Sequence, residues 1–239
     1  MFLYFSLIIV MIPAVAVGIW AQYKFNNAFE TYSAIKTKKK DPAVVVARSL
    51  LGQSRATKHV MVLCTEKHLS DHYNPKKKEV VLSSSIHRGN NIAAVSVAAH
   101  EVGHAVQHGE KSILMMIWQV VGLVANISSQ ILWPIMILGM VFGLGSLYGP
   151  VGDIFVYIGL AFFGITLIYS LANLPLELDA SRRALKMLKK TGDYDKEELA
   201  GAKVVLDAAA LTYLAATITS FLYMLRFVLY ILAMRSRRR

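Results

Sequence analysis

The chain has 239 residues, of which 55% are hydrophobic and 17% charged, and its net charge is +11. A soluble domain carries about 25% charged residues, so this composition indicates a membrane protein. The single cysteine, Cys64, excludes an internal disulfide and a CxxC metal site. No nucleic-acid-binding motif accompanies the basic residues, so no nucleic-acid partner is expected.

The first predicted element is an N-terminal transmembrane anchor at residues 1–22. A span needs about 20 apolar residues, and this segment contains no charged residue. It lacks the basic start of a signal peptide, and its apolar core is too long for one. We therefore expect the segment to be retained in the protein.

Residues 23–111 predict a cytoplasmic region with a small α+β fold. The segment "DPAVVVARSLLG" predicts a helix in which Asp41 is the N-cap, Pro42 the first helical residue and Gly52 the end. "HVMVLCT" and "EVVLS" predict strands, because both are rich in Val and Leu. The second strand could bind an extended peptide by edge addition, but a purely structural hairpin fits equally well.

The region ends in an apolar helix that starts at Asn90 or Asn91, either of which can cap it. Between the two predicted strands, "YNPKKK" (Tyr73–Lys78) has the Asn-Pro pair of a turn. His72, in "SDHYNP", is a candidate contact for the substrate or the transition state. A turn-forming role for Asp71–Pro75 fits equally well.

The remaining chain divides into three predicted parts. Residues 112–174 predict a transmembrane hairpin, with an external turn at Gly145–Asp153. Residues 175–203 predict a helix and a cytoplasmic loop. Residues 204–239 predict hydrophobic helices, the last of them interfacial or re-entrant, and a basic tail. We expect about three to four membrane helices in a mainly α-helical protein.

The distribution of basic residues predicts the orientation in the membrane. Fourteen of the 26 Lys and Arg residues lie between Lys24 and Lys111, and seven lie between Arg182 and Lys203. Because basic segments stay on the cytoplasmic side, both regions are expected in the cytoplasm. Anionic lipid headgroups are the expected neighbours of "KTKKK" and "RSRRR".

The segment "VAAHEVGHAVQH" carries the strongest chemical signal. His100 and His104 lie four residues apart and therefore share one helix face, where both imidazoles can bind one tetrahedral zinc ion. Glu101 is rotated by about 100° around the helix axis from His100, so it can act as general base toward a zinc-bound water. Small residues surround the motif, so these ionisable groups would be buried, which is costly without a partner. The HExxH pattern therefore predicts a catalytic zinc site.

A catalytic zinc ion normally has a third protein ligand, and few acidic residues follow His104. Position disfavours most of them, since they lie on the same helix, in the external turn, in a solvated loop or one helix later: Glu110, Asp153, Asp193, Asp195, Glu197, Glu198 and Asp207. Glu177 and Asp179 remain. Two membrane crossings return both to the side on which His104 lies.

The chain resembles the YugP-type neutral zinc metallopeptidases of bacterial membranes and, more distantly, the HtpX membrane proteases. The resemblance covers nearly the full length and includes "SDHYNPKKKEVVLS", "SVAAHEVGHAVQ" and "LPLELDASRRAL". HtpX-type enzymes have an ExxAD motif whose Glu binds zinc, which favours Glu177 over Asp179. Ser181 stands where that motif has Asp, so Ser181 or Asp179 would have to replace the carboxylate that orients a ligating histidine.

Together these features predict a zinc endopeptidase, of the gluzincin type, in the bacterial inner membrane with its site facing the cytoplasm. His100, His104 and Glu177 would bind Zn2+, Glu101 would activate water, and a peptide or membrane protein would be the substrate. The alternative is a non-catalytic zinc-binding scaffold or chaperone. An open fourth position argues against it, because structural zinc normally has four protein ligands.

Overall fold

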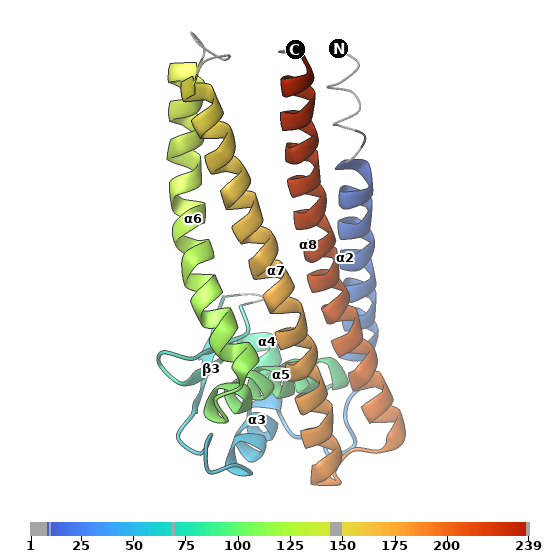
Figure 1. Cartoon of the computed structure of the whole chain (residues 1–239). Helices are drawn as coiled ribbons and strands as arrows, with labels where there is room; N and C mark the ends of the chain where they lie inside the picture. The colour runs from blue at the N-terminus through green and yellow to red at the C-terminus, as the bar shows by residue number, and fades with distance from the viewer. Residues whose placement is uncertain (1–8, 10, 68–69, 144–149, 238–239) are drawn as a thin grey trace. The chain divides into compact units, whose positions relative to one another are not determined.

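The computed structural model describes residues 9, 11–67, 70–143 and 150–237, which are mainly helical with one small sheet (Figure 1). The chain divides into two compact units. The first contains Met1–Trp20, Ile117–Leu174 and Tyr213–Arg239, and the second contains Ala21–Met116 and Pro175–Thr212. The division therefore does not follow chain order, since both units are assembled from separate segments.

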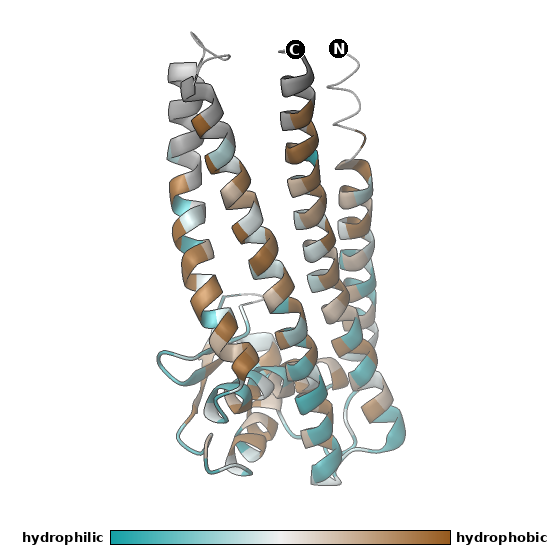
Figure 2. Cartoon of the chain, in the orientation of Figure 1, coloured by the Kyte–Doolittle hydropathy of each residue, from teal (hydrophilic) through white to brown (hydrophobic). Residues whose placement is uncertain are grey.

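The first unit consists of helical segments in which hydrophobic residues, brown in Figure 2, predominate over hydrophilic ones where the figure colours them. They belong to four helices: α2 (Met11–Ser33), α6 (Ile113–Gly143), α7 (Pro150–Thr191) and α8 (Lys196–Arg237). Among the described residues, α7 and α8 are long and apolar enough to cross a membrane. A third span is obtained if the bent pair of α5 (Ile92–Gly109) and α6 counts as one.

Two predicted membrane features lie partly outside the described residues. In the first predicted span, residues 1–22, residues 1–8 and 10 are not described, whereas α2 begins at Met11 and continues to Ser33. The external turn predicted at Gly145–Asp153 also falls largely on residues that are not described. Its C-terminal part is helical instead, because α7 begins at Pro150, a residue well suited to the first position of a helix.

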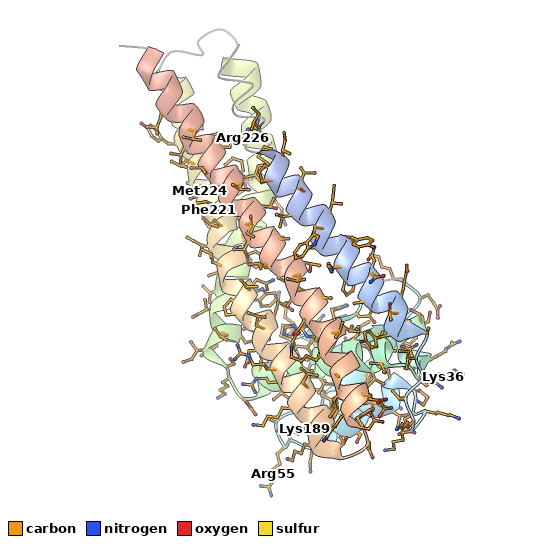
Figure 3. All side chains as sticks on the ribbon, turned by 90° about the vertical axis from the view of Figure 1, so that its right-hand side faces the viewer. Lys36, Arg55, Lys189, Phe221, Met224 and Arg226 are labelled. Atoms are coloured by element: carbon orange, nitrogen blue, oxygen red, sulfur yellow. The ribbon has the colours of Figure 1, made fainter. Side chains whose placement is uncertain are left out.

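The C-terminal prediction of two separate helices is wrong, because α8 is continuous from Lys196 to Arg237. No glycine or proline follows Gly201 in this helix, so nothing interrupts its hydrogen-bond ladder. Within the first unit, α7 and α8 are joined by a hydrogen bond of 3.0 Å between the hydroxyls of Ser170 and Ser220. Figure 3 labels Phe221, Met224 and Arg226 along this stretch of α8.

The second unit contains a three-stranded sheet with the order β1-β3-β2. Strand β3 (Glu79–Ser83) pairs in parallel with β1 (Met61–Thr65) and antiparallel with β2 (His72–Asn74). The prediction that "EVVLS" offers a free edge is therefore wrong, because this segment is the central strand. Among the described residues, β1 and β2 are the edge strands of this sheet.

The turn between β2 and β3 lies within the predicted segment "YNPKKK". Residues 72–74 form β2, and residues 75–78 make the turn. The Asn74 side chain accepts hydrogen bonds from the backbone N–H groups of Lys76 and Lys77, both at 3.1 Å. Lys78 closes the turn with a φ of 57°. The predicted turn is therefore confirmed, and it is an Asx turn formed by Asn74.

The helices of the second unit pack around the sheet and around α5. Helix α3 is Ala43–Gly52, and α4 is Ser84–Arg88. Residues of β3 and α5 form the centre of the core and are fully buried: Val80, Leu82, Ala98, Ala99 and Val102. This packing holds α5 rigidly, which matters because the predicted zinc-binding histidines lie on it.

The two predicted helix starts had different outcomes. Asn91 caps α5, since its side chain accepts a hydrogen bond of 2.8 Å from the Ala94 N–H. Asp41 does not cap α3. Pro42 occupies the N-cap position there, and the Asp41 carboxylate pairs instead with the Lys39 ammonium at 3.3 Å.

The start of α8 is tied to the loop that contains "KTKKK". Asp195 and Glu198 form a reciprocal capping box, and the Glu198 carboxylate also accepts a hydrogen bond of 2.7 Å from the Lys38 N–H. Lys38 pairs with Asp195, and Lys39 pairs with Asp193. Glu198, predicted to be solvated, is therefore buried, and two lysines expected at lipid headgroups have partners within the protein.

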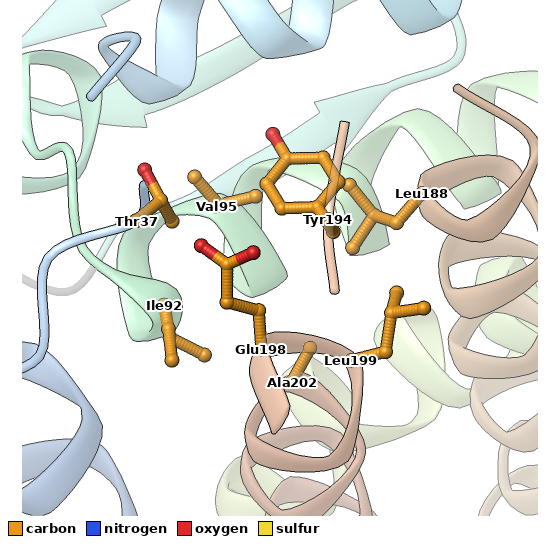
Figure 4. A pocket seen from close by; sticks show the side chains of 8 residues that line it. All are labelled: Thr37, Ile92, Val95, Leu188, Tyr194, Glu198, Leu199 and Ala202. Carbon is orange, nitrogen blue, oxygen red and sulfur yellow. The ribbon is translucent and has the colours of Figure 1, made fainter. Parts of the chain in front are cut away.

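A small cavity of about 10 Å³ lies beside this capping box, between Thr37, Tyr194 and the Glu198 side chain (Figure 4). Its volume corresponds to about one water molecule, so it is too small for a ligand. By contrast, the basic side chains labelled in Figure 3, Lys36, Arg55 and Lys189, project outward from the second unit. Headgroup binding by the basic segments stays a prediction.

Candidate metal centre

The two predicted histidine ligands lie one turn apart on α5. The rings of His100 and His104 meet edge to face, with centroids 4.8 Å apart, and each side chain is only 13% exposed. Alanine, valine and glycine residues flank them and are buried. The local sequence therefore builds a rigid helix whose two imidazoles share one face.

A close helix–helix approach brings the third group to this face. Gly103 lies against α7, where a Cβ atom on the glycine would be 2.6 Å from the Ala180 carbonyl oxygen. No other residue fits this contact without displacing backbone. Glu177 lies one turn before Ala180 on α7, so the absent side chain at position 103 permits the approach that places Glu177.

Glu177 completes a compact group of nitrogen and oxygen donors. Its Oε2 lies 3.0 Å from His100 Nε2 and 3.4 Å from His104 Nε2. One ligand atom from each of the three residues lies within 4.8 Å of the others. Zinc bonds of about 2.0–2.2 Å place tetrahedral ligands about 3.3–3.5 Å apart. The donor types and their spacing therefore fit a zinc ion.

Burial and mutual contact shift the pKa values of the ionisable side chains in this site. All of these side chains lie outside the uncharged part of α7, which ends before Glu177. Burial raises the pKa of Glu101, although the neighbouring imidazoles oppose the shift. Burial also acts to raise the pKa of Glu177, but hydrogen bonds from both histidines outweigh it and lower that pKa. The pKa of His104 is raised, because Glu177 outweighs the effect of burial. The site thus holds a carboxylate that is stabilised by positive charge.

Comparison with known proteins agrees with this donor set. The family model described as "Putative neutral zinc metallopeptidase" matches residues 7–232. The chain belongs to this family. It is also 34% identical over 222 residues to "Putative membrane protease YugP" of Bacillus subtilis (strain 168), which covers 93% of this chain and 95% of that protein. The resemblance to the YugP-type peptidases is confirmed. No solved structure matches the chain significantly.

In this member of the zinc metallopeptidase family, the outer nitrogens of both histidines contact polar side chains. Ser181 Oγ lies 3.2 Å from His100 Nδ1, at the position where the HtpX-type motif has Asp. Gln107 Oε1 lies 3.0 Å from His104 Nδ1. Sequence reasoning named Ser181 but missed Gln107. Its position could have indicated this role, because Gln107 is a polar residue three positions after His104 in an otherwise apolar part of the helix.

Asp179, the rival to Glu177, lies beside the site and contacts neither histidine directly. Its Oδ2 accepts hydrogen bonds of 2.8 Å from Gln107 Nε2 and 2.7 Å from Arg183 Nε. Burial acts to raise the pKa of Asp179, but these two bonds outweigh it and lower the pKa. Arg183 also pairs with Glu110, at the end of α5. The Asp179 carboxylate therefore belongs to a polar network between α5 and α7.

The other acidic candidates have different partners. Asp193 and Asp195 pair with lysines near residue 38, and Asp207 pairs with Lys203. His72 is exposed at the start of β2, where its Nδ1 lies 2.7 Å from the Ser70 carbonyl oxygen. Its role as a substrate contact stays a prediction.

We expect Gly103→Ala to lower both the thermal stability and the zinc content of the purified protein. The added methyl group would meet the Ala180 carbonyl oxygen, and overpacking of this kind typically costs about 1–3 kcal/mol. Gly52→Ala is the matched control, because nothing lies within 4 Å of a Cβ at that position. Thermal unfolding in detergent and metal analysis would test this. Equal values for the two variants would contradict it.

Proposed function

We propose that the protein is an integral-membrane zinc-dependent endopeptidase in which His100, His104 and Glu177 bind the metal and Glu101 is the general base. The observation that carries this proposal is the convergence of the three donors within 4.8 Å, with Glu101 buried on the same helix. Membership of the zinc metallopeptidase family supports it. A third ligand from a distant helix is what a catalytic HExxH site needs.

The roles follow from what each side chain can do. Zinc, when bound, supplies a Lewis acid that polarises the scissile carbonyl and acidifies water. Glu101 takes a proton from the attacking water and returns it to the leaving amine. Its buried position favours the neutral carboxyl, whereas a nearby cation favours the carboxylate that can accept the proton.

The free edge of β2 supports a peptide as substrate. Tyr73 on β2 makes a hydrogen bond of 2.8 Å, through its hydroxyl, with His108 Nδ1. His108 lies one turn after His104, so this edge strand borders the helix that carries the site. An extended peptide that paired with β2 would bind by main-chain hydrogen bonds, independent of its sequence.

The rival is a membrane scaffold or chaperone that uses zinc only for structure. Three donors from the protein leave a fourth tetrahedral position for water or substrate, whereas structural zinc is normally closed by four protein ligands. The buried Glu101 has no task in a purely structural site and costs free energy there. Both points favour the enzyme.

The charge distribution supports a site that faces the cytoplasm of a bacterial cell membrane. Residues 24–111 and 182–203 together contain 21 of the 26 Lys and Arg residues. If the continuous α8 crosses the membrane once, the tail "RSRRR" lies on the side opposite to these regions. The 21 basic residues of these regions then determine the orientation, and the basic tail lies on the outer side, against the usual rule.

Glu101→Gln is expected to retain zinc and to lose peptide hydrolysis by at least about 10²-fold, the usual contribution of a general base. Glu197→Gln, at an exposed position, is the control and should behave as the wild type. Metal analysis and a casein-type assay on purified protein provide the two readouts. A variant that loses its zinc, or that cleaves normally, would refute the role of Glu101. A wild-type protein that binds zinc without cleavage would favour the scaffold.

Glu177→Ala should reduce zinc affinity much more than Asp179→Ala. The first change removes a metal ligand, whereas the second removes a carboxylate outside the donor set, which typically costs about 10–100-fold. Competition with a zinc-binding dye measures both variants under the same conditions. If Asp179→Ala empties the site and Glu177→Ala does not, the ligand assignment is wrong. If neither changes the zinc content, Asp207 becomes the next candidate.

The proposed orientation can be tested by cysteine labelling in intact cells. Cys64 is exposed on the second unit and should not react with an impermeant maleimide until the membrane is opened. A cysteine introduced by Asp153→Cys, in a background with Cys64→Ser, should react in intact cells. The opposite pattern of labelling would overturn the proposed topology.

A further inference from the structure

Gln107 is a buried amide that contacts both halves of the candidate site. It is 0% exposed, and it lies on α5 one turn after His104. Its Nε2 donates hydrogen bonds of 2.9 Å to the Leu176 carbonyl oxygen and 2.8 Å to Asp179 Oδ2. Its Oε1 faces His104 Nδ1 at 3.0 Å. Every N–H and the oxygen of this amide therefore has a partner.

These partners determine how the amide is oriented. The Leu176 carbonyl can only accept a hydrogen bond, so it must face the NH2 end of Gln107. Asp179 Oδ2, which also accepts from Arg183 Nε, lies at the same end. The oxygen end is left for His104, so Nδ1 of that histidine must carry a proton. Nε2, which faces Glu177, is then the one ring nitrogen that can offer a lone pair to a metal ion.

The corresponding contact of His100 does not impose this constraint. Ser181 meets His100 Nδ1 with a hydroxyl group, which can donate or accept a hydrogen bond. The hydroxyl is therefore compatible with either tautomer of His100. Of the two histidines, His104 alone has its tautomer fixed by a neighbour that can only accept.

The bond from Gln107 to the backbone adds a second function. Leu176 immediately precedes Glu177, so the same amide that orients His104 also holds the backbone next to the third donor. The outer end of the network is anchored as well, because Arg183 bridges Asp179 on α7 and Glu110 at the end of α5. The position of His104 relative to Glu177 is thus fixed by a chain of directional contacts.

We propose that Gln107 is a positioning residue that holds His104 in the metal-binding tautomer and fixes the position of His104 relative to Glu177. This inference rests on the proposed zinc site and adds a residue that acts through His104, without touching metal or substrate. Groups that orient metal-bound histidines typically change metal affinity by about 10–100-fold when they are removed.

The test compares two substitutions of similar size in the full-length protein. Gln107→Met removes every hydrogen bond of the amide, and we expect zinc affinity to fall by about 10–100-fold and the absorption spectrum of the Co2+-substituted protein to change. Gln107→Glu keeps an oxygen that accepts from His104 Nδ1. A proton shared with the adjacent Asp179 gives it a donor at the other end, so it should recover part of the affinity and a spectrum close to that of the wild type. If Gln107→Met does not fold, the shorter Gln107→Asn takes its place, because its amide cannot reach His104.

Ser96→Ala provides the matched control for general damage to the helix. Ser96 is also 0% exposed on α5, and within the described part of the chain its hydroxyl bonds only to the Ile92 carbonyl oxygen, at 2.7 Å. This variant should lose stability and keep wild-type zinc affinity. The proposal is overturned if Gln107→Met binds zinc as the wild type does, if Gln107→Glu recovers nothing, or if Ser96→Ala weakens zinc binding equally.

Zinc affinity and the Co2+ spectrum do not depend on catalysis, so the two proposals can fail separately. A wild-type protein that binds zinc but cleaves no peptide refutes the endopeptidase proposal, and the Gln107 variants are still decided by their affinities. A wild-type protein that binds no zinc refutes both.

Discussion

The candidate site depends on one close contact between two helix backbones. At Gly103, α7 approaches α5 so closely that a Cβ atom would come within 2.6 Å of the Ala180 carbonyl oxygen. Glu177 and Ser181 flank Ala180 at helical spacing and therefore face the same side of α7. Both contact His100: Glu177 at Nε2 and Ser181 at Nδ1. The glycine thus fixes the geometry of residues that are 77 positions apart in the chain.

Such proximity brings charged groups together in a setting that is poor in water. Glu101 and Glu177 are each 8% exposed, and two imidazoles lie beside them. Isolated charges in such a place would be strongly unfavourable, so each must be compensated. Glu177 is compensated by both histidines, and Asp179 by Gln107 and Arg183. The polar network between the helices is therefore a condition for burying the site, in addition to orienting it.

The sequence predicted the parts of the site that follow from periodicity within one helix. The spacing of His100 and His104, and the cap at Asn91, are local properties of α5. Glu177 was reached by elimination together with the family resemblance. Gln107 was missed because its importance comes from Leu176 and Asp179, and no spacing rule relates residues 69 or 72 positions away.

The errors in the fold have the same origin. Asp41 and Glu198 were assigned from local rules for caps and solvated loops, but contacts with Lys39 and Lys38 determined their actual positions. The sheet order placed "EVVLS" in the centre, although the segment alone reads equally well as an edge strand. The C-terminal segment was divided into two helices so that the basic tail would stay on the cytoplasmic side. No residue in its sequence breaks a helix, and α8 is continuous.

The separation of the donors along the chain also has a consequence in time. Chains are made from the N-terminus at about 5–20 residues per second, so Glu177 is added roughly 4–15 s after His100. The apolar segments of α6 and α7 are synthesised in that interval. A growing chain therefore carries a two-histidine half-site that lacks its third donor until the intervening helices exist, and translation itself delays the appearance of a complete centre.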